Sequence, residues 1–133
     1  NYQEDYLSFL EVLGGLGTIT EYDESLFHII TSIFGSGPAW YLELSSKIVE
    51  AAERLGLEKS EANKIIKELV RSLPSFLSDD EFSSTVDKIK SPNGTTEAGL
   101  NSLVEDSFDK IIYNAIESAT NKSQQISKEI NND

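Results

Sequence analysis

The loop Ile89–Leu100, with the sequence IKSPNGTTEAGL, holds the residues whose types and spacing best suit binding chemistry. We expect a helix to start near Thr95, with Thr95 or Thr96 as its cap. Its N-terminus leaves several backbone N–H groups unpaired, including those of Gly94, Thr95 and Thr96, and the helix dipole adds partial positive charge there. Gly94 allows a ligand to approach the backbone closely, and the hydroxyls of Ser91 and both threonines add further donors and acceptors. The loop is therefore a candidate site for a carboxylate.

The same residue types are also common in ordinary turns. Pro, Asn, Gly and Thr together suit a connector that caps the next helix, and capped turns greatly outnumber binding loops. On residue types alone, the plain connector is the favoured interpretation, and the binding site is the alternative that needs a further argument.

The segment Gly35-Ser36-Gly37-Pro38 is a second candidate. We expect a helix to begin here, with Ser36 as its cap and Pro38 in the first turn, where the missing N–H costs nothing. Close packing at a helix start and a ligand-facing role explain these glycines equally well.

The remaining polar residues give weaker signals. His28 is the only histidine and the chain has no cysteine, so we expect no metal site and assign His28 a packed or interface position. Asp79-Asp80 suit the negative charges of a helix N-terminus, and Glu105-Asp106 suit a solvated surface. Neither pair indicates a catalytic dyad.

Composition limits the classes of partner. The 133 residues fit one domain, and the net charge of −12, from 23 acidic and 11 basic residues, repels phosphate backbones and anionic lipid heads. We therefore expect no nucleic acid and no membrane as partner, and a cytoplasmic protein. The N-terminus does not resemble a signal peptide. Methionine is absent even at position 1, which indicates a processed chain or a piece of a longer protein.

Helical periodicity runs along most of the chain and predicts an all-α fold. Gly56 is typical of a helix C-terminus, and Ser60 suits the cap of the next helix. A stretch around Ile19 and Tyr22 resembles a short strand, and beyond Thr120 the polar sequence predicts a fraying or partner-contacting tail. The expected helices cover residues 4–13, 23–34, 36–55, 60–73, 79–89, 95–105 and 107–120.

Four stretches carry a resemblance to a known family. FGSGPAW, AERLGL, DKIKSPNGTTEAGL and SFDKIIYNAIESA follow one another as in the C-terminal dimerisation domain of pyrroline-5-carboxylate reductases, a 6-phosphogluconate-dehydrogenase-like helical domain. The resemblance covers about Glu21 to Ala119, and LSFLEVLGGLGTITEYDE is similar to the end of the family's nucleotide-binding domain. It implies a bundle of long helices in an intertwined homodimer. The implied parts are residues 1–22 (remnant of a Rossmann domain, helix plus strand), 23–120 (dimerisation and substrate binding) and 121–133 (polar tail).

The resemblance also implies a reaction and its residues. The family reduces 1-pyrroline-5-carboxylate, a small molecule, to L-proline with NADP or NAD as cofactor. The substrate carboxylate would be held by Ser91, Asn93, Gly94, Thr95 and Thr96. Thr96 would also be the catalytic residue, hydrogen-bonding near the imine nitrogen. Gly35, Ser36, Gly37 and Pro38 would lie near the nicotinamide.

The chain departs from the family pattern at three positions. Asn93 stands where the family usually has Gly, Lys90 where it often has Thr, and Trp40 replaces Tyr. Asn tolerates the left-handed backbone region, so we expect the loop shape to be kept. No G-x-G-x-x-G follows a strand in the sequence, so we expect no cofactor bound to this chain alone and no activity from it. A non-catalytic helical dimerisation module and a reductase of a related cyclic imine or keto acid remain alternatives.

Overall fold

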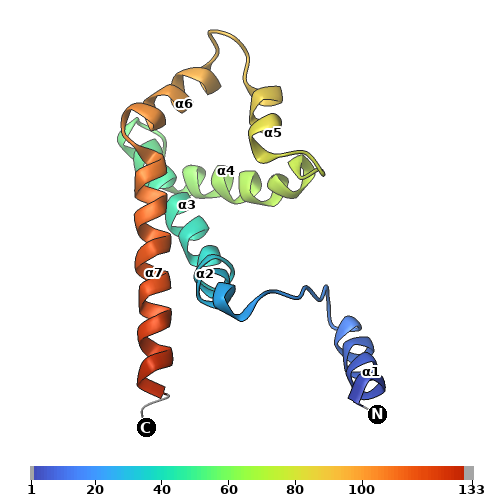
Figure 1. The fold of residues 1–133 in the computed structure, drawn as a ribbon. Coiled ribbons are helices and arrows are strands. Elements are labelled where there is room, and N and C mark those ends of the chain that lie inside the picture. The colour runs from blue at the N-terminus through green and yellow to red at the C-terminus, as the bar shows by residue number, and fades with distance from the viewer. Residues whose placement is uncertain (1, 131–133) are drawn as a thin grey trace.

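The structure is a computed structural model and describes residues 2–130. Every regular element in these residues is helical (Figure 1). The main helices are α1 (Tyr2–Gly14), α2 (Phe27–Ile30), α3 (Ser36–Arg54), α4 (Lys59–Ser72), α5 (Phe82–Ile89), α6 (Thr95–Glu105) and α7 (Phe108–Ile130). Short turns of other helix types are η1 (Glu24–Leu26), η2 (Thr31–Gly35) and η3 (Leu73–Phe76). The all-α prediction is confirmed.

α3 begins at Ser36 as expected, but the expected cap by Ser36 and the expected break in the helix before it are wrong. The backbone stays helical from α2 through η2, a five-residue π-helical turn, into α3, and Ser36 has a helical backbone conformation and caps nothing. Proline inside a helix clashes with the carbonyl four residues earlier, which for Pro38 belongs to Phe34 in η2. The wider π turn gives that carbonyl room, so the helix continues through the proline instead of beginning at it.

Other local expectations also need correction. Residues 18–23 contain no strand, because a lone strand has no edge to pair with in the described chain. The helix expected from residue 79 begins at Phe82, and the tail expected to fray beyond Thr120 is helical to Ile130. Glu58, not Ser60, caps α4, since its carboxylate accepts the amide of Ser60 at 2.8 Å. A carboxylate at this place also interacts favourably with the helix dipole.

Two helix pairs form the packed part of the chain. α3 packs against α4, and α2 with η2 packs along α7 (Figure 1). Ser32 in η2 is 2% exposed and its hydroxyl lies 2.7 Å from that of Thr120 in α7, while His28 Nδ1 lies 3.0 Å from the Ser123 hydroxyl. α1 stands apart from these pairs at the end of residues 15–23 (Figure 1).

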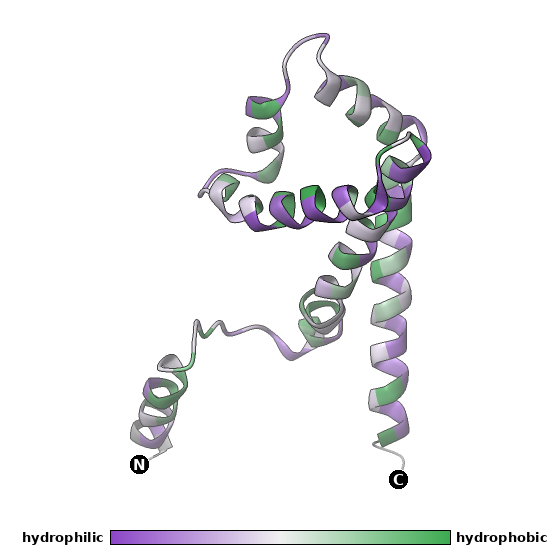
Figure 2. Cartoon of the chain, turned by 180° about the vertical axis from the view of Figure 1, so that it is seen from behind, coloured by the Kyte–Doolittle hydropathy of each residue, from purple (hydrophilic) through white to green (hydrophobic). Residues whose placement is uncertain are grey.

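A single chain buries very little apolar surface. Val49 and Ala62 are its only buried hydrophobic residues in the described part, and green hydrophobic positions lie uncovered along α4 and α7 (Figure 2). The exposed area is 11251 Å², whereas a compact monomer of 14.7 kDa exposes about 6,900 Å² by the general mass scaling. The difference of about 4,300 Å² is surface that a compact fold would bury. No helix within residues 2–130 is long and apolar enough to cross a membrane.

Candidate functional site

The loop between α5 and α6 has the backbone shape that its sequence predicts. Asn93 has a φ of 58°, inside the left-handed region, so asparagine takes the conformation that a glycine would take easily. The next residue, Gly94, is extended with a φ of −90° and is the N-cap of α6. Asn93 thus has the left-handed conformation that we expected asparagine to tolerate, and preservation of the family's loop shape stays a prediction.

The amides at the start of α6 are only partly free. Asn93 donates its N–H to Glu97 Oε2 at 2.8 Å, and Gly94 donates to the Ser91 carbonyl at 3.0 Å, which closes a tight turn. The amides of Thr95 and Thr96 have no acceptor among residues 2–130, and no side chain caps the Gly94 position. The expectation that the Gly94 amide also points to a ligand is therefore wrong, and so is the expected threonine cap.

Gly94 is needed for packing within the turn. A Cβ built on it would lie 2.3 Å from Ser91 Oγ and 3.0 Å from the Ser91 carbonyl oxygen, and its φ is one that any residue adopts. The glycine therefore lets Ser91 fold back over the N-terminus of α6. The other role that we expected for Gly94, access for a ligand to the backbone, stays a prediction.

Gly94→Ala is expected to open this turn, because the new methyl group must displace Ser91. Gly99→Ala is the matched control: it lies in the same helix, nothing would approach its Cβ within 4 Å, and alanine should favour the helix by about 0.5–1 kcal/mol. Amide hydrogen exchange of residues 90–96 should speed up in the first variant and stay unchanged in the second. Equal exchange in both variants would contradict this role of Gly94.

The side chains of the loop are arranged around these amides. Ser91, Asn93 and Thr95 are exposed, and Thr96 is half-buried with no hydrogen-bond partner for its hydroxyl among the described residues. Lys90 lies 3.0 Å from Asp87. The hydrogen bond and charge of Asp87 raise the pKa of Lys90, with a smaller contribution from the Glu97 charge. Free donors and one nearby cation suit a small anionic ligand.

The segment 35–38 lies elsewhere in the single chain. Gly37 is buried and Ser36 half-buried at the η2–α3 junction, while Gly35 and Pro38 are exposed. The α5–α6 loop lies at the far end of the molecule from this junction (Figure 1). One chain therefore does not bring the two candidate segments together.

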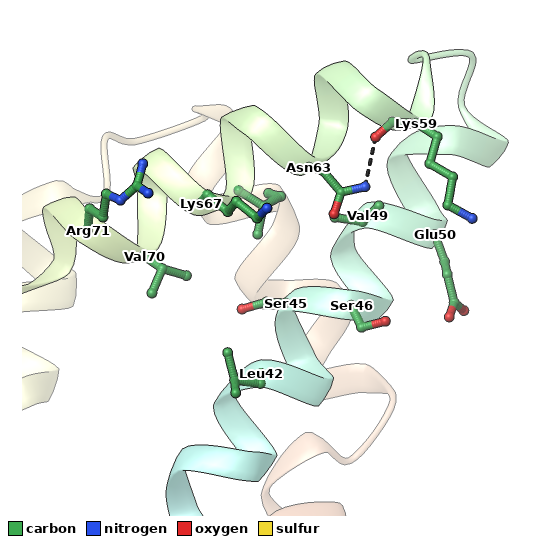
Figure 3. Close-up of a pocket in the computed structure, with 11 residues that line it drawn as sticks. Leu42, Ser45, Ser46, Val49, Glu50, Lys59, Asn63, Lys67, Val70 and Arg71 are labelled. Carbon is green, nitrogen blue, oxygen red and sulfur yellow. Dashed lines mark hydrogen bonds between the residues drawn. The ribbon is translucent and has the colours of Figure 1, made fainter.

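A hollow in the described chain lies between α3 and α4, and the loop is not among the residues that line it. It has a volume of about 450 Å³, with Leu42, Val49 and Val70 on its apolar side and Lys67 and Arg71 at its polar edge (Figure 3). A second hollow of about 310 Å³ lies between α2 and the end of α7, beside His28. No group of acidic, histidine or cysteine side chains suited to a metal occurs within residues 2–130.

Sequence reasoning missed Glu97, the one carboxylate bonded to the loop backbone. It occupies the third helical position of α6, where an acidic side chain commonly reaches back to an amide just before the helix. That general signal is present in the sequence, but it does not say which amide is bound.

The fold and the comparisons define the class of protein as a helical dimerisation domain. The family model described as pyrroline-5-carboxylate reductase dimerisation matches residues 24–126. The chain therefore belongs to the pyrroline-5-carboxylate reductase family.

Individual relatives agree with the family model. The chain is 32% identical over 124 residues to a pyrroline-5-carboxylate reductase of Staphylococcus haemolyticus, covering 92% of this chain and 46% of that protein. It is 34% identical over 121 residues to pyrroline-5-carboxylate reductase 1 of Bacillus subtilis, covering 90% and 41%. The chain thus spans half or less of the length of these curated relatives.

Solved structures show the same fold. The Plasmodium falciparum pyrroline carboxylate reductase with NADP bound superposes with a TM-score of 0.77 at 28% identity, covering 92% of this chain and 50% of that one. A 1-pyrroline-5-carboxylate reductase from Streptococcus pyogenes gives a TM-score of 0.75 at 28% identity, covering 82% and 43%.

Proposed function

We propose that this chain is the C-terminal dimerisation and substrate-binding domain of a cytoplasmic pyrroline-5-carboxylate reductase. The full-length enzyme would reduce 1-pyrroline-5-carboxylate to L-proline with NADPH or NADH, a step of proline biosynthesis. The observation that carries the proposal is the match of the reductase dimerisation family over residues 24–126, with the free amides of the α5–α6 loop inside it.

The proposed homodimer is supported by the surface that one chain leaves open. Long-lived interfaces between subunits bury about 2,000–5,000 Å² in total, or about 1,000–2,500 Å² on each chain. This chain exposes about 4,300 Å² more than a compact monomer of its mass, which is more than enough surface for such an interface. α3 and α7 carry several large apolar side chains that touch too little of their own chain to be buried. A second copy packed along these helices would cover them, and the two chains would be intertwined.

The proposed substrate site uses the start of α6. The substrate carboxylate would accept hydrogen bonds from the amides of Thr95 and Thr96, with the positive end of the helix dipole behind them. The Thr96 hydroxyl has no intrachain partner in the described residues. It would form a hydrogen bond at or near the imine nitrogen of the substrate. These contacts would hold the substrate ring in one orientation, so positioning would supply most of the catalysis.

We expect that the residues of this chain would not hold the cofactor by themselves. Gly35, Ser36, Gly37 and Pro38 lie in helical backbone, whose amides do not form the open glycine-rich turn that binds a pyrophosphate. At most, the exposed Gly35 and Pro38 offer a surface beside the nicotinamide. When bound, NADPH or NADH supplies the hydride, and the rest of the cofactor would be held by a nucleotide-binding domain outside this chain.

The test compares the protein from the complete reading frame with residues 1–133 alone. We expect the full-length protein to oxidise NADPH or NADH in the presence of 1-pyrroline-5-carboxylate and to form L-proline. Residues 1–133 should give no turnover and no nucleotide binding by calorimetry. A full-length protein without this activity would refute the proposed function, and turnover by residues 1–133 would refute the assignment of the cofactor to another domain.

Two alternatives are distinguished by the same assay. A non-catalytic dimerisation module would form the dimer and reduce no substrate, whereas a reductase of a related cyclic imine would prefer a different ring or side group. The left-handed Asn93 keeps the loop backbone in the shape that a glycine permits, which favours a working substrate loop over a degenerate one.

A further inference from the structure

We propose that Glu97 is a positioning residue of the substrate loop, and that it acts through its hydrogen bond to the Asn93 amide. The inference rests on the proposed function, because the loop that Glu97 holds is the proposed carboxylate site. Glu97 would not touch the substrate. Its part is to keep the loop in the shape that leaves the Thr95 and Thr96 amides open.

The geometry carries this role. Glu97 Oε2 accepts the N–H of Asn93 at 2.8 Å, and Asn93 is one of two non-glycine residues in the described chain with a positive φ. The left-handed region is disfavoured for residues with a Cβ, so such a residue persists where neighbouring groups hold it. A charge-assisted hydrogen bond to its own amide is a direct way to hold it.

The bond also decides which amides stay free. With the Asn93 amide bound to Glu97 Oε2 and the Gly94 amide bound to the Ser91 carbonyl, the amides of Thr95, Thr96 and Glu97 have no acceptor among the described residues. Without the carboxylate, the Asn93 amide would be open and the residue could relax out of the left-handed region. The Thr95 and Thr96 amides would then lose their fixed direction relative to the loop side chains.

The charge of Glu97 and its hydrogen bond have opposite effects on an anionic substrate. The charge lies at the same helix N-terminus as the substrate carboxylate and repels it. The Lys90 ammonium, paired with Asp87, offsets part of that repulsion. Glutamine at position 97 keeps an oxygen acceptor but removes the charge, whereas alanine removes both, so the two variants separate the hydrogen bond from the charge.

The experiment uses the full-length protein with Glu97→Gln, Glu97→Ala and the control Glu105→Ala, an exposed glutamate at the far end of α6. We expect Glu97→Ala to raise the KM for 1-pyrroline-5-carboxylate about tenfold, with kcat within about twofold of wild type. Glu97→Gln should have a KM equal to or below that of wild type, and the control should match wild type. Amide exchange of residues 90–96 without substrate should speed up only in Glu97→Ala.

Three results would overturn the inference. A wild-type KM and wild-type exchange in Glu97→Ala would show that the bond does not position the loop. A Glu97→Gln variant as impaired as Glu97→Ala would show that the charge, not the hydrogen bond, is required. Both results leave an active wild type and therefore the proposed function intact, whereas a wild-type protein without reductase activity overturns the function and this inference together.

Discussion

Replacing Ile48 with aspartate is expected to dissociate the proposed homodimer of this chain. Ile48 lies in the middle of α3 and is 39% exposed, and Tyr41, Leu44 and Leu55 extend the same helical stripe at spacings of three, four and seven residues. Such a stripe on the surface of a long helix is typical of a subunit interface. A carboxylate at its centre would have to be desolvated without a partner whenever the dimer forms.

The size of this effect follows from the cost of an unpaired buried charge, about 3–5 kcal/mol. That cost raises the dimer dissociation constant by a factor of about 100 or more. Sedimentation equilibrium should give twice the chain mass of 14.7 kDa for wild type. For Ile48→Asp it should give the mass of one chain, whether that chain is folded or unfolded.

Lys47→Asp is the matched control for this variant. It adds an aspartate at the neighbouring position, on the charged face where Lys47 pairs with Glu43 and Glu50. Because exposed ion pairs contribute little, this variant should remain a dimer. An Ile48→Asp protein that sediments as wild type would show that the stripe on α3 is not the interface.

Thr96→Val is expected to lower kcat/KM of the full-length protein about a hundredfold, the usual cost of removing one donor aimed at the reacting atoms. Valine has nearly the shape of threonine but lacks the hydroxyl, so the backbone of α6 and its free amides should persist. The half-buried Thr96 hydroxyl has no partner within the described chain, so its loss leaves no internal group unpaired.

The control is Thr85→Val, a half-buried threonine of α5 outside the loop. This variant should keep wild-type kinetics, and circular dichroism should show the same helix content and unfolding temperature in both variants. If Thr96→Val kept full kcat/KM while the enzyme remained active, the hydroxyl would have no part in the reaction, and the backbone amides alone would bind the substrate.

Local backbone features were predictable from the sequence. The helical periodicity, the stop at Gly56 with its φ of 102°, and the left-handed turn at Asn93 depend on residues within a few positions of one another. Glycine adopts positive φ freely and asparagine tolerates it better than most residues, so the positions of such turns can be predicted locally. The resemblance to the reductase family, which the family match confirms, also rested on motif order alone.

It was harder to predict which of several neighbouring groups caps a helix or binds a given backbone amide. Ser36 and Pro38 carry the signals of a helix start, yet the chain absorbs the proline with the π turn of η2. Glu58 replaces Ser60 as a cap, and the Glu97 carboxylate and the Ser91 carbonyl take two amides that the sequence alone left open for a ligand. Several groups near a helix end can reach the same amides, and their geometry decides which one binds.

The sequence by itself determined the all-α class, the family and the position of the loop between α5 and α6, because these follow from short-range periodicity and motif spacing. Only the tertiary structure showed that one chain leaves its long helices uncovered and keeps the α5–α6 loop away from the η2–α3 junction. The physical reason is that burial depends on which surfaces meet in space. Apolar stripes look alike in sequence whether they face the same chain, a second copy or another domain.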